Sequence, residues 1–106
     1  MKLWIDNYCP APEGYVWCKT TNEAKTVLTC VQQMQNIEIT ENLPVVEIVD
    51  IGDYVGECHY YGGHFIEVLK FIEKNRWNFP VHLHGKDNME IEKMFEVVRR
   101  NGWQTT

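Results

Sequence analysis

The feature that most constrains the fold is the alternation of short apolar segments with longer amphipathic ones. Four segments have the composition of strands: "KLWID" (2–6), "YVWCK" (15–19), "PVVEIVD" (44–50) and "PVHLH" (80–84). An amphipathic segment follows the second, the third and the fourth of them. This alternation predicts a single small α/β domain over residues 1–106, with a mostly parallel four-stranded sheet, three helices in two or three layers, and the element order ββαβαβα.

Each amphipathic segment carries a start signal and an apolar stripe. The motif "TTNE" is a capping box in which Thr20 caps the first helix and Glu23 reaches back. The second helix is expected to begin near Gly63 or His64, and the third to be capped by Asp87 and to stop at Gly102. The predicted core stripes are Ala24, Val27, Leu28 and Val31; Phe65, Val68, Leu69 and Ile72; and Ile91, Met94, Phe95 and Val98.

The direction of the second strand relative to the first is left open by the sequence. Only "NYCPAPEGY" joins the two, which is short for a parallel crossover. Either this loop crosses the sheet without a helix, or the first two strands form an antiparallel pair.

Charge and cysteine content narrow the functional class. The net charge of −5 argues against general nucleic-acid binding, which requires a stripe of basic residues. No apolar run is long enough for a membrane span. Acidity can steer a small protein toward a positively charged surface. Cys9, Cys18, Cys30 and Cys58 show no C-x-x-C spacing, and "MKLWID" leads directly into structure. Reduced thiols in a cytoplasmic protein, mostly packed as small apolar groups, are therefore predicted.

Polar side chains follow three of the predicted strands at their carboxyl ends, where open parallel sheets bind ligands. Asp6 and Asn7 end the first strand, Asp50 and Asp53 the third, and His82, His84 and Lys86 the fourth. Strand alternation puts His82 and His84 on one face, where they can ligate a metal or act in acid–base chemistry. A zinc site needs three or four ligands, and no compact pattern of this kind is present, so buried hydrogen-bonded histidines are favoured.

The segment "VDIGDYVGECHYYGGHF" (49–65) combines acids, histidines, a cysteine, tyrosines and paired glycines. Tyr54, Tyr60 and Tyr61 with small glycines and mixed charge are typical of a recognition surface. Gly62 and Gly63 lack a dinucleotide or P-loop fingerprint, and paired glycines before a helix are more often a joint. Most of the tryptophans and phenylalanines are expected in the core.

Several of these phrases together resemble the cyclic-phosphate-processing receiver-like family of prokaryotic conflict systems. They are "MKLWIDNYCPAPEGYVWCKTTNEA", "VDIGDY", "GGHFIEVLKFIEK" and "HLHGKDNMEIEKM" with "RRNGW", which span nearly the whole chain. The resemblance implies a receiver-like fold and a site of acids and a histidine that hydrolyses cyclic phosphates, with Mg²⁺ or Mn²⁺ on Asp6 and Asp50. It also implies a bacterial cytoplasm, or that of a bacterial host for a phage-encoded chain.

The chain departs from this family at its acids. Asn7 replaces the second of two consecutive acids, the central Leu-Asp-His-Asp-Leu-Gly motif keeps Asp50 and Gly52 but lacks an acid and its histidine, and Gly85 replaces the hydroxyl after His84. These losses favour a catalytically degenerate domain that binds a protein or nucleotide partner without a required cofactor, such as a phage or mobile-element inhibitor of a defence component. The alternative is a metal-assisted phosphodiesterase with Asp50 and His84 as base and acid. Partner contacts are then expected from Asp6, Asn7, Asp53, Tyr54, Tyr60, Tyr61, His82 and Lys86.

Overall fold

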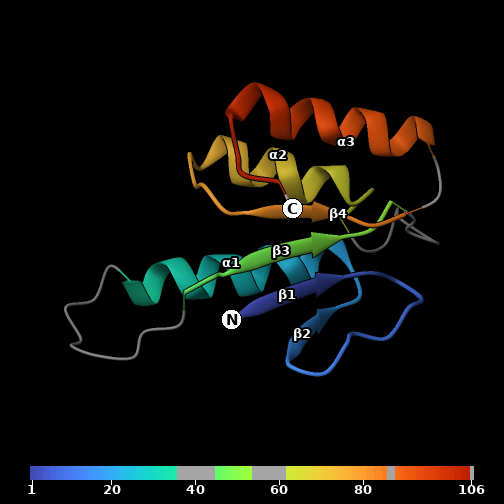
Figure 1. Cartoon of the computed structure of the whole chain (residues 1–106). Coiled ribbons are helices and arrows are strands. Elements are labelled where there is room, and N and C mark those ends of the chain that lie inside the picture. The colour runs from blue at the N-terminus through green and yellow to red at the C-terminus, as the bar shows by residue number, and fades with distance from the viewer. Residues whose placement is uncertain (36–44, 54–61, 86–87, 106) are drawn as a thin grey trace.

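The sheet is all-parallel and has four strands. The computed structural model describes residues 1–35, 45–53, 62–85 and 88–105. Its strands are β1 (Lys2–Ile5), β2 (Tyr15–Cys18), β3 (Ile48–Ile51) and β4 (Val81–Leu83), in the spatial order β2-β1-β3-β4 (Figure 1). The predicted α/β class and element order are confirmed. The first two strands are parallel, so the short segment between them crosses over without a helix.

Three helices follow the last three strands: α1 (Thr21–Gln35), α2 (Ile66–Lys74) and α3 (Asn88–Asn101). The predicted cap of α1 and the predicted stop of α3 are confirmed, whereas Asp87, the predicted cap of α3, lies outside the described residues. Thr20 Oγ1 accepts a hydrogen bond from Glu23 N at 3.1 Å, and Glu23 reaches back to Lys19 N at 2.8 Å. After α3, Gly102 has a φ of 67°, and its N–H donates to Arg99 O.

The helices cover one face of the sheet, and the residues of the strands are therefore alternately buried and partly exposed. Leu3 and Ile5 on β1, Val49 and Ile51 on β3 and Val81 on β4 are fully buried. Strand register puts these residues on the same face as Cys18 and Leu83. Cys18 lines a hollow with Val27 of α1, and Leu83 lines one with Ile91 of α3. Since α2 contacts both other helices, the domain has two layers.

The opposite face of the sheet, called here the open face, keeps aromatic and polar side chains in partial contact with solvent. Trp4, Tyr15, Trp17, Ile48 and His82 are half-buried there, and Asp50 is the buried exception. The 6–14 loop lies against this face, since Trp4 Nε1 donates to Cys9 O at 2.8 Å. A loop on the face opposite the helices gives the β1–β2 crossover the usual right-handed sense.

Some local predictions are wrong in ways that packing explains. Helix α2 begins at Ile66, after a turn in which Gly62 and Gly63 have φ values of 97° and 94°. Val97 takes the core position expected for Phe95, which is 39% exposed beneath the Arg99 guanidinium. The aromatic residues are also less buried than predicted, with Phe65, Phe79 and Trp103 in the core but Trp4, Trp17, Phe71 and Trp77 only partly covered.

The cysteines divide between the core and the surface. Cys18 is buried as predicted, whereas Cys9 and Cys30 are exposed, and all three are free thiols. Cys58 lies outside the described residues. Among the helices that the structure describes, none combines the length and apolar character that a bilayer span requires.

Candidate functional site

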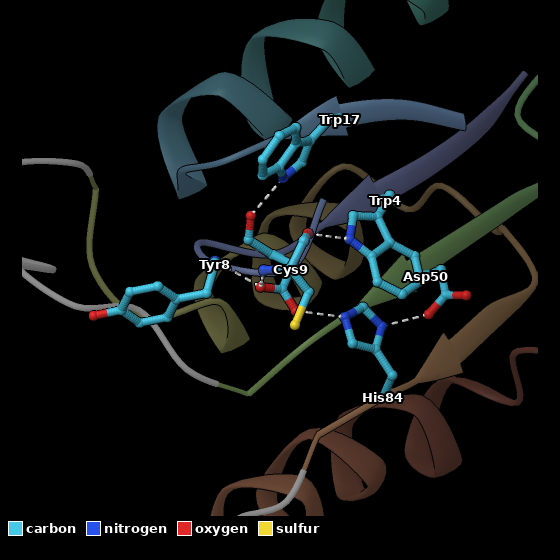
Figure 2. A network of polar contacts seen from close by, with 7 residues as sticks. Trp4, Tyr8, Cys9, Trp17, Asp50 and His84 are labelled. Atoms are coloured by element: carbon cyan, nitrogen blue, oxygen red, sulfur yellow. Dashed lines mark hydrogen bonds and ion pairs between the residues drawn. The ribbon is translucent and has the colours of Figure 1, made fainter. Parts of the chain in front are cut away.

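Three side chains from three parallel strands meet at the carboxyl edge of the sheet. Asp6 directly follows β1, Asp50 lies in β3, and His84 directly follows β4. The His84 Nε2 atom lies 2.8 Å from Asp6 Oδ2, and Nδ1 lies 2.5 Å from Asp50 Oδ1 (Figure 2). The chain leaves β1 toward β2 on one side and later fills β3 on the other, so this group sits at the topological switch point. We call Asp6, Asp50 and His84 the triad.

The Asp6 side chain is fixed by the loop that follows it. Its Oδ1 accepts hydrogen bonds from the backbone N–H groups of Tyr8 and Cys9, both at 2.8 Å (Figure 2). This is the local turn that a short acidic side chain favours. The backbone carbonyl of Asp6 accepts a further bond from Trp17 Nε1 at 2.8 Å. Both carboxylate oxygens of Asp6 are therefore engaged, one with the loop and one with His84.

The His84 ring is held on its faces as well as at its nitrogens. The Trp4 indole stacks on it with a centroid distance of 3.9 Å and an interplanar angle of 9°. The exposed fractions of the side chains are 20% for His84, 14% for Asp6 and 10% for Asp50. An ionised carboxylate can only accept hydrogen bonds, so with both acids ionised each ring nitrogen donates. The His84 ring thus bridges the two acids, with one ring nitrogen at each carboxyl group.

Two glycines leave the space that the triad and its neighbour fill. A Cβ atom on Gly52 would stand 3.1 Å from both Asp6 Oδ2 and His84 Nε2. A Cβ on Gly85 would stand 2.5 Å from the Asp53 carboxyl group. Backbone close approach at these two positions lets Asp53 reach the same edge.

The structure brings together only part of the predicted site. Asp6, Asp50 and His84 converge, and Asp53 lies beside them, while Asn7 turns away to donate from Nδ2 to Lys19 O at 3.3 Å. His82 is in β4, paired in register with Asp50. Tyr54, Tyr60, Tyr61 and Lys86 lie outside the described residues.

Sequence reasoning missed Trp4 and Gly52 as members of the site. Alternation with Leu3 and Ile5 already places Trp4 on the other face of its strand, which was the available signal. The role of Gly52 could not be inferred, because it depends on the close approach of two side chains from distant strands.

A divalent cation does not fit the residues present. Both Asp6 oxygens and Asp50 Oδ1 are occupied by hydrogen-bond donors of the protein, and the His84 ring fills the space between the two carboxylates. Within residues 1–35, 45–53, 62–85 and 88–105, no group of three or more His, Cys, Asp or Glu side chains is arranged to hold a metal ion. A receiver-type cation site needs several free carboxylate oxygens, and within the described residues neither oxygen of Asp6 nor Asp50 Oδ1 is free to serve as one.

A separate hollow of about 390 Å³ lies between β2 and α1, lined by Trp17, Cys18, Asn22, Glu23, Thr26 and Val27. Burial, with a smaller contribution from the Glu23 carboxylate, raises the pKa of the Cys18 thiol to about 11. Because the thiolate is the reactive form, Cys18 is a packing residue and not a nucleophile.

Comparison with known proteins gives no match: no family model, no curated sequence and no solved structure is similar to this chain.

Proposed function

We propose that this chain is a receiver-like domain that acts by binding a protein partner at the carboxyl edge of its sheet, without turnover. The observation that carries this proposal is that the polar atoms of the triad are hydrogen-bonded to one another and to the backbone of the domain. Both nitrogens of His84 and both oxygens of Asp6 already have partners within the domain. A general base needs a lone pair directed at its substrate, and in this arrangement the histidine has none to offer.

The charge at the edge favours a cationic partner over a phosphate substrate. The triad has two carboxylates against one imidazole, Asp53 adds another acid beside it, and the chain as a whole carries −5. Such a field repels phosphate and speeds association with a positively charged protein surface.

The resemblance in sequence supplies the biological setting. A relative of receiver-like domains from prokaryotic conflict, with the acids for turnover lost, is suited to inhibit a defence component as a phage or mobile-element product. Together with the acidic edge, this setting favours a basic, nucleic-acid-handling protein as the partner. Binding by this route requires no cofactor.

The experiment is capture of a partner from bacterial lysate, followed by titration of the purified partner against matched variants. Asp53→Asn removes one charge at the carboxyl edge, and Glu13→Gln removes one from the exposed turn before β2, at the other end of the strands. The first is expected to slow association severalfold at low salt and the second to leave it unchanged. A Tyr60→Ala/Tyr61→Ala double variant tests the predicted tyrosine surface. Equal effects of the two charge variants would remove the carboxyl edge from the proposal.

A second candidate function, phosphodiester hydrolysis, is favoured by the convergence itself. Asp50 Oδ1 and His84 Nδ1 lie 2.5 Å apart, and the His84 ring keeps 20% of its side-chain surface exposed. In this role Asp50 and His84 are the general base and acid acting on a cyclic phosphate.

An activity panel separates the two candidates. The wild-type protein is incubated with cyclic nucleotides and 2′,3′-cyclic phosphates, with and without Mg²⁺ or Mn²⁺. The binding proposal expects no turnover. Turnover that is lost in His84→Ala and Asp50→Asn, but kept in His82→Ala, would replace it with the hydrolase.

A further inference from the structure

We propose that the His84 side chain takes the place of a metal: its ring occupies the position between Asp6 and Asp50 that a divalent ion would take. The edge thereby keeps its two carboxylates in position without metal. Removing the ring should create a site that accepts either a divalent ion or a free imidazole molecule. This inference concerns the triad alone and does not depend on which partner the domain binds.

The geometry of the ring supports this substitution. An imidazolium has two N–H donors on opposite sides of a planar ring, and here each of them meets a carboxylate from a different strand. Without a positive group between them, two neighbouring carboxylates repel one another. The ring therefore links the ends of β1 and β3 as a bridging ion would, and it adds the end of β4 to the same cluster.

The surroundings hold the ring in this position. Trp4 stacks on it at 3.9 Å with an interplanar angle of 9°, which covers one face of the ring. Gly52 has no side chain, and a Cβ atom at this position would crowd His84 Nε2 and Asp6 Oδ2. A side chain packed in this way is part of the domain, so an incoming metal ion would have to displace it.

Removal of the ring leaves carboxylate oxygens of the kind that ligate Mg²⁺. Asp6 Oδ2 and Asp50 Oδ1 lose their protein partner, while Asp6 Oδ1 keeps its two backbone donors and holds the carboxylate in place. One or two carboxylates with several waters is the usual ligand set of Mg²⁺ in proteins. Asp6 and Asp50 were expected from the family resemblance to hold such an ion, and the histidine explains why they do not fit one in this chain.

The first test is Mn²⁺ binding, followed through paramagnetic broadening of backbone amide signals and by calorimetry. The wild-type protein is expected to show no broadening centred on Asp6 and Asp50 at millimolar Mn²⁺. His84→Gly should bind Mn²⁺ there at least about tenfold more tightly, and adding Asp50→Asn should abolish the gain. His82→Gly is the matched control, expected to behave as the wild type does.

The second test is chemical rescue of His84→Gly with free imidazole. Imidazole should raise the melting temperature of this variant and displace Mn²⁺ from it, with no such effect on the wild type or on His82→Gly. N-methylimidazole, which has only one ring nitrogen able to donate, should rescue less well.

Either test can overturn the inference. Broadening centred on Asp6 and Asp50 in the wild-type protein, with the same affinity as in His84→Gly, would show that the histidine does not exclude the ion. Failure of imidazole both to stabilise His84→Gly and to compete with Mn²⁺ would show that no imidazole site exists. If His84→Gly does not fold, the wild-type broadening remains decisive, and His84→Lys, whose ammonium group can donate to both carboxylates, should fold and still exclude Mn²⁺.

Discussion

The two faces of this sheet are built from alternate residues of the same strands, yet they serve different purposes. The helix face presents Leu3, Ile5, Val49 and Ile51, all at 0% exposure. The open face presents Trp4, Tyr15, Trp17 and His82 in partial contact with solvent, and the triad lies at its carboxyl end. The helix face is a generic apolar core, whereas the triad and the stack of Trp4 on His84 lie on the other side.

This difference shows how a half-covered sheet can carry a site. The helix layer supplies stability through burial, so the open face needs few apolar residues of its own. Its aromatic rings pair with positive groups instead, as Trp17 does with Lys19 and Tyr15 with Lys2. Substitutions on the two faces should therefore have different kinds of effect.

The largest expected effect comes from Ile51, compared with Ile48 in the same strand. Ile51→Ala removes a fully buried side chain from the helix face and should cost about 2–5 kcal/mol of unfolding free energy. Ile48→Ala makes the same change on the open face, where the side chain is half-buried, and should cost about 1 kcal/mol. Urea unfolding of both variants gives the two values. Equal losses would contradict the division between the faces.

Next in size is the loss of His84, compared with that of His82. His84→Ala leaves two partly buried carboxylates without their donor, which should cost about 1–3 kcal/mol. His82→Ala lies on the same face and should cost less. Thermal unfolding with chemical denaturation as a check measures both, and a greater loss from His82→Ala would argue against the triad as the main polar contact of this face.

A smaller effect is expected where a lysine covers an aromatic ring of the open face. Lys19 Nζ lies 4.5 Å from the Trp17 ring centroid, and Lys19→Met should cost about 0.5 kcal/mol. Lys2, at 5.6 Å from the Tyr15 ring, is the control with the longer contact. Urea unfolding measures both losses; Lys2→Met should cost less than Lys19→Met, and equal losses would assign the effect to net charge.

The smallest effect belongs to the helix layer and is visible only in acid. Hydrogen bonds from Arg100 and Asn101 lower the pKa of Glu73 from 4.5 to about 2. A carboxyl group with a lowered pKa in the folded state contributes stability above its unfolded pKa, and this is lost as the pH falls from about 4.5 to 2. Glu73→Gln should flatten the stability profile in this window, whereas Glu96→Gln, on an exposed pair with Arg99, should not.

The sequence was sufficient for the elements that depend on local pattern. Alternation predicted the order of strands and helices, and it placed Asp6, Asp50 and His84 at one edge before their contacts were known. It could not decide the direction of β2, because the 6–14 loop is compatible with both pairings and only packing against Trp4 and Trp17 fixes it. The predicted third strand was too long at its start because ladder pairing with β1 begins only at Ile48, opposite Lys2.

Other features depend on neighbours in three dimensions and could not be predicted from the sequence pattern. Phe95 matched the apolar stripe, yet Val97 faces the core in its stead, since the stripe of α3 is rotated toward α2 and β4. The stacking of Trp4 on His84 joins positions 80 residues apart, and no local signal reports such a contact.

The triad also bears on the order in which the domain folds. Its two bonds span 78 and 34 residues of chain, and the stack of Trp4 on His84 in the same site spans 80. Long closures cost entropy that is recovered only after the intervening elements are in place. The triad can therefore assemble only when β4 docks beside β3, and a chain stalled earlier would have its central strands but no assembled triad. Formation of the triad therefore reports that β4 has docked and that the sheet is complete.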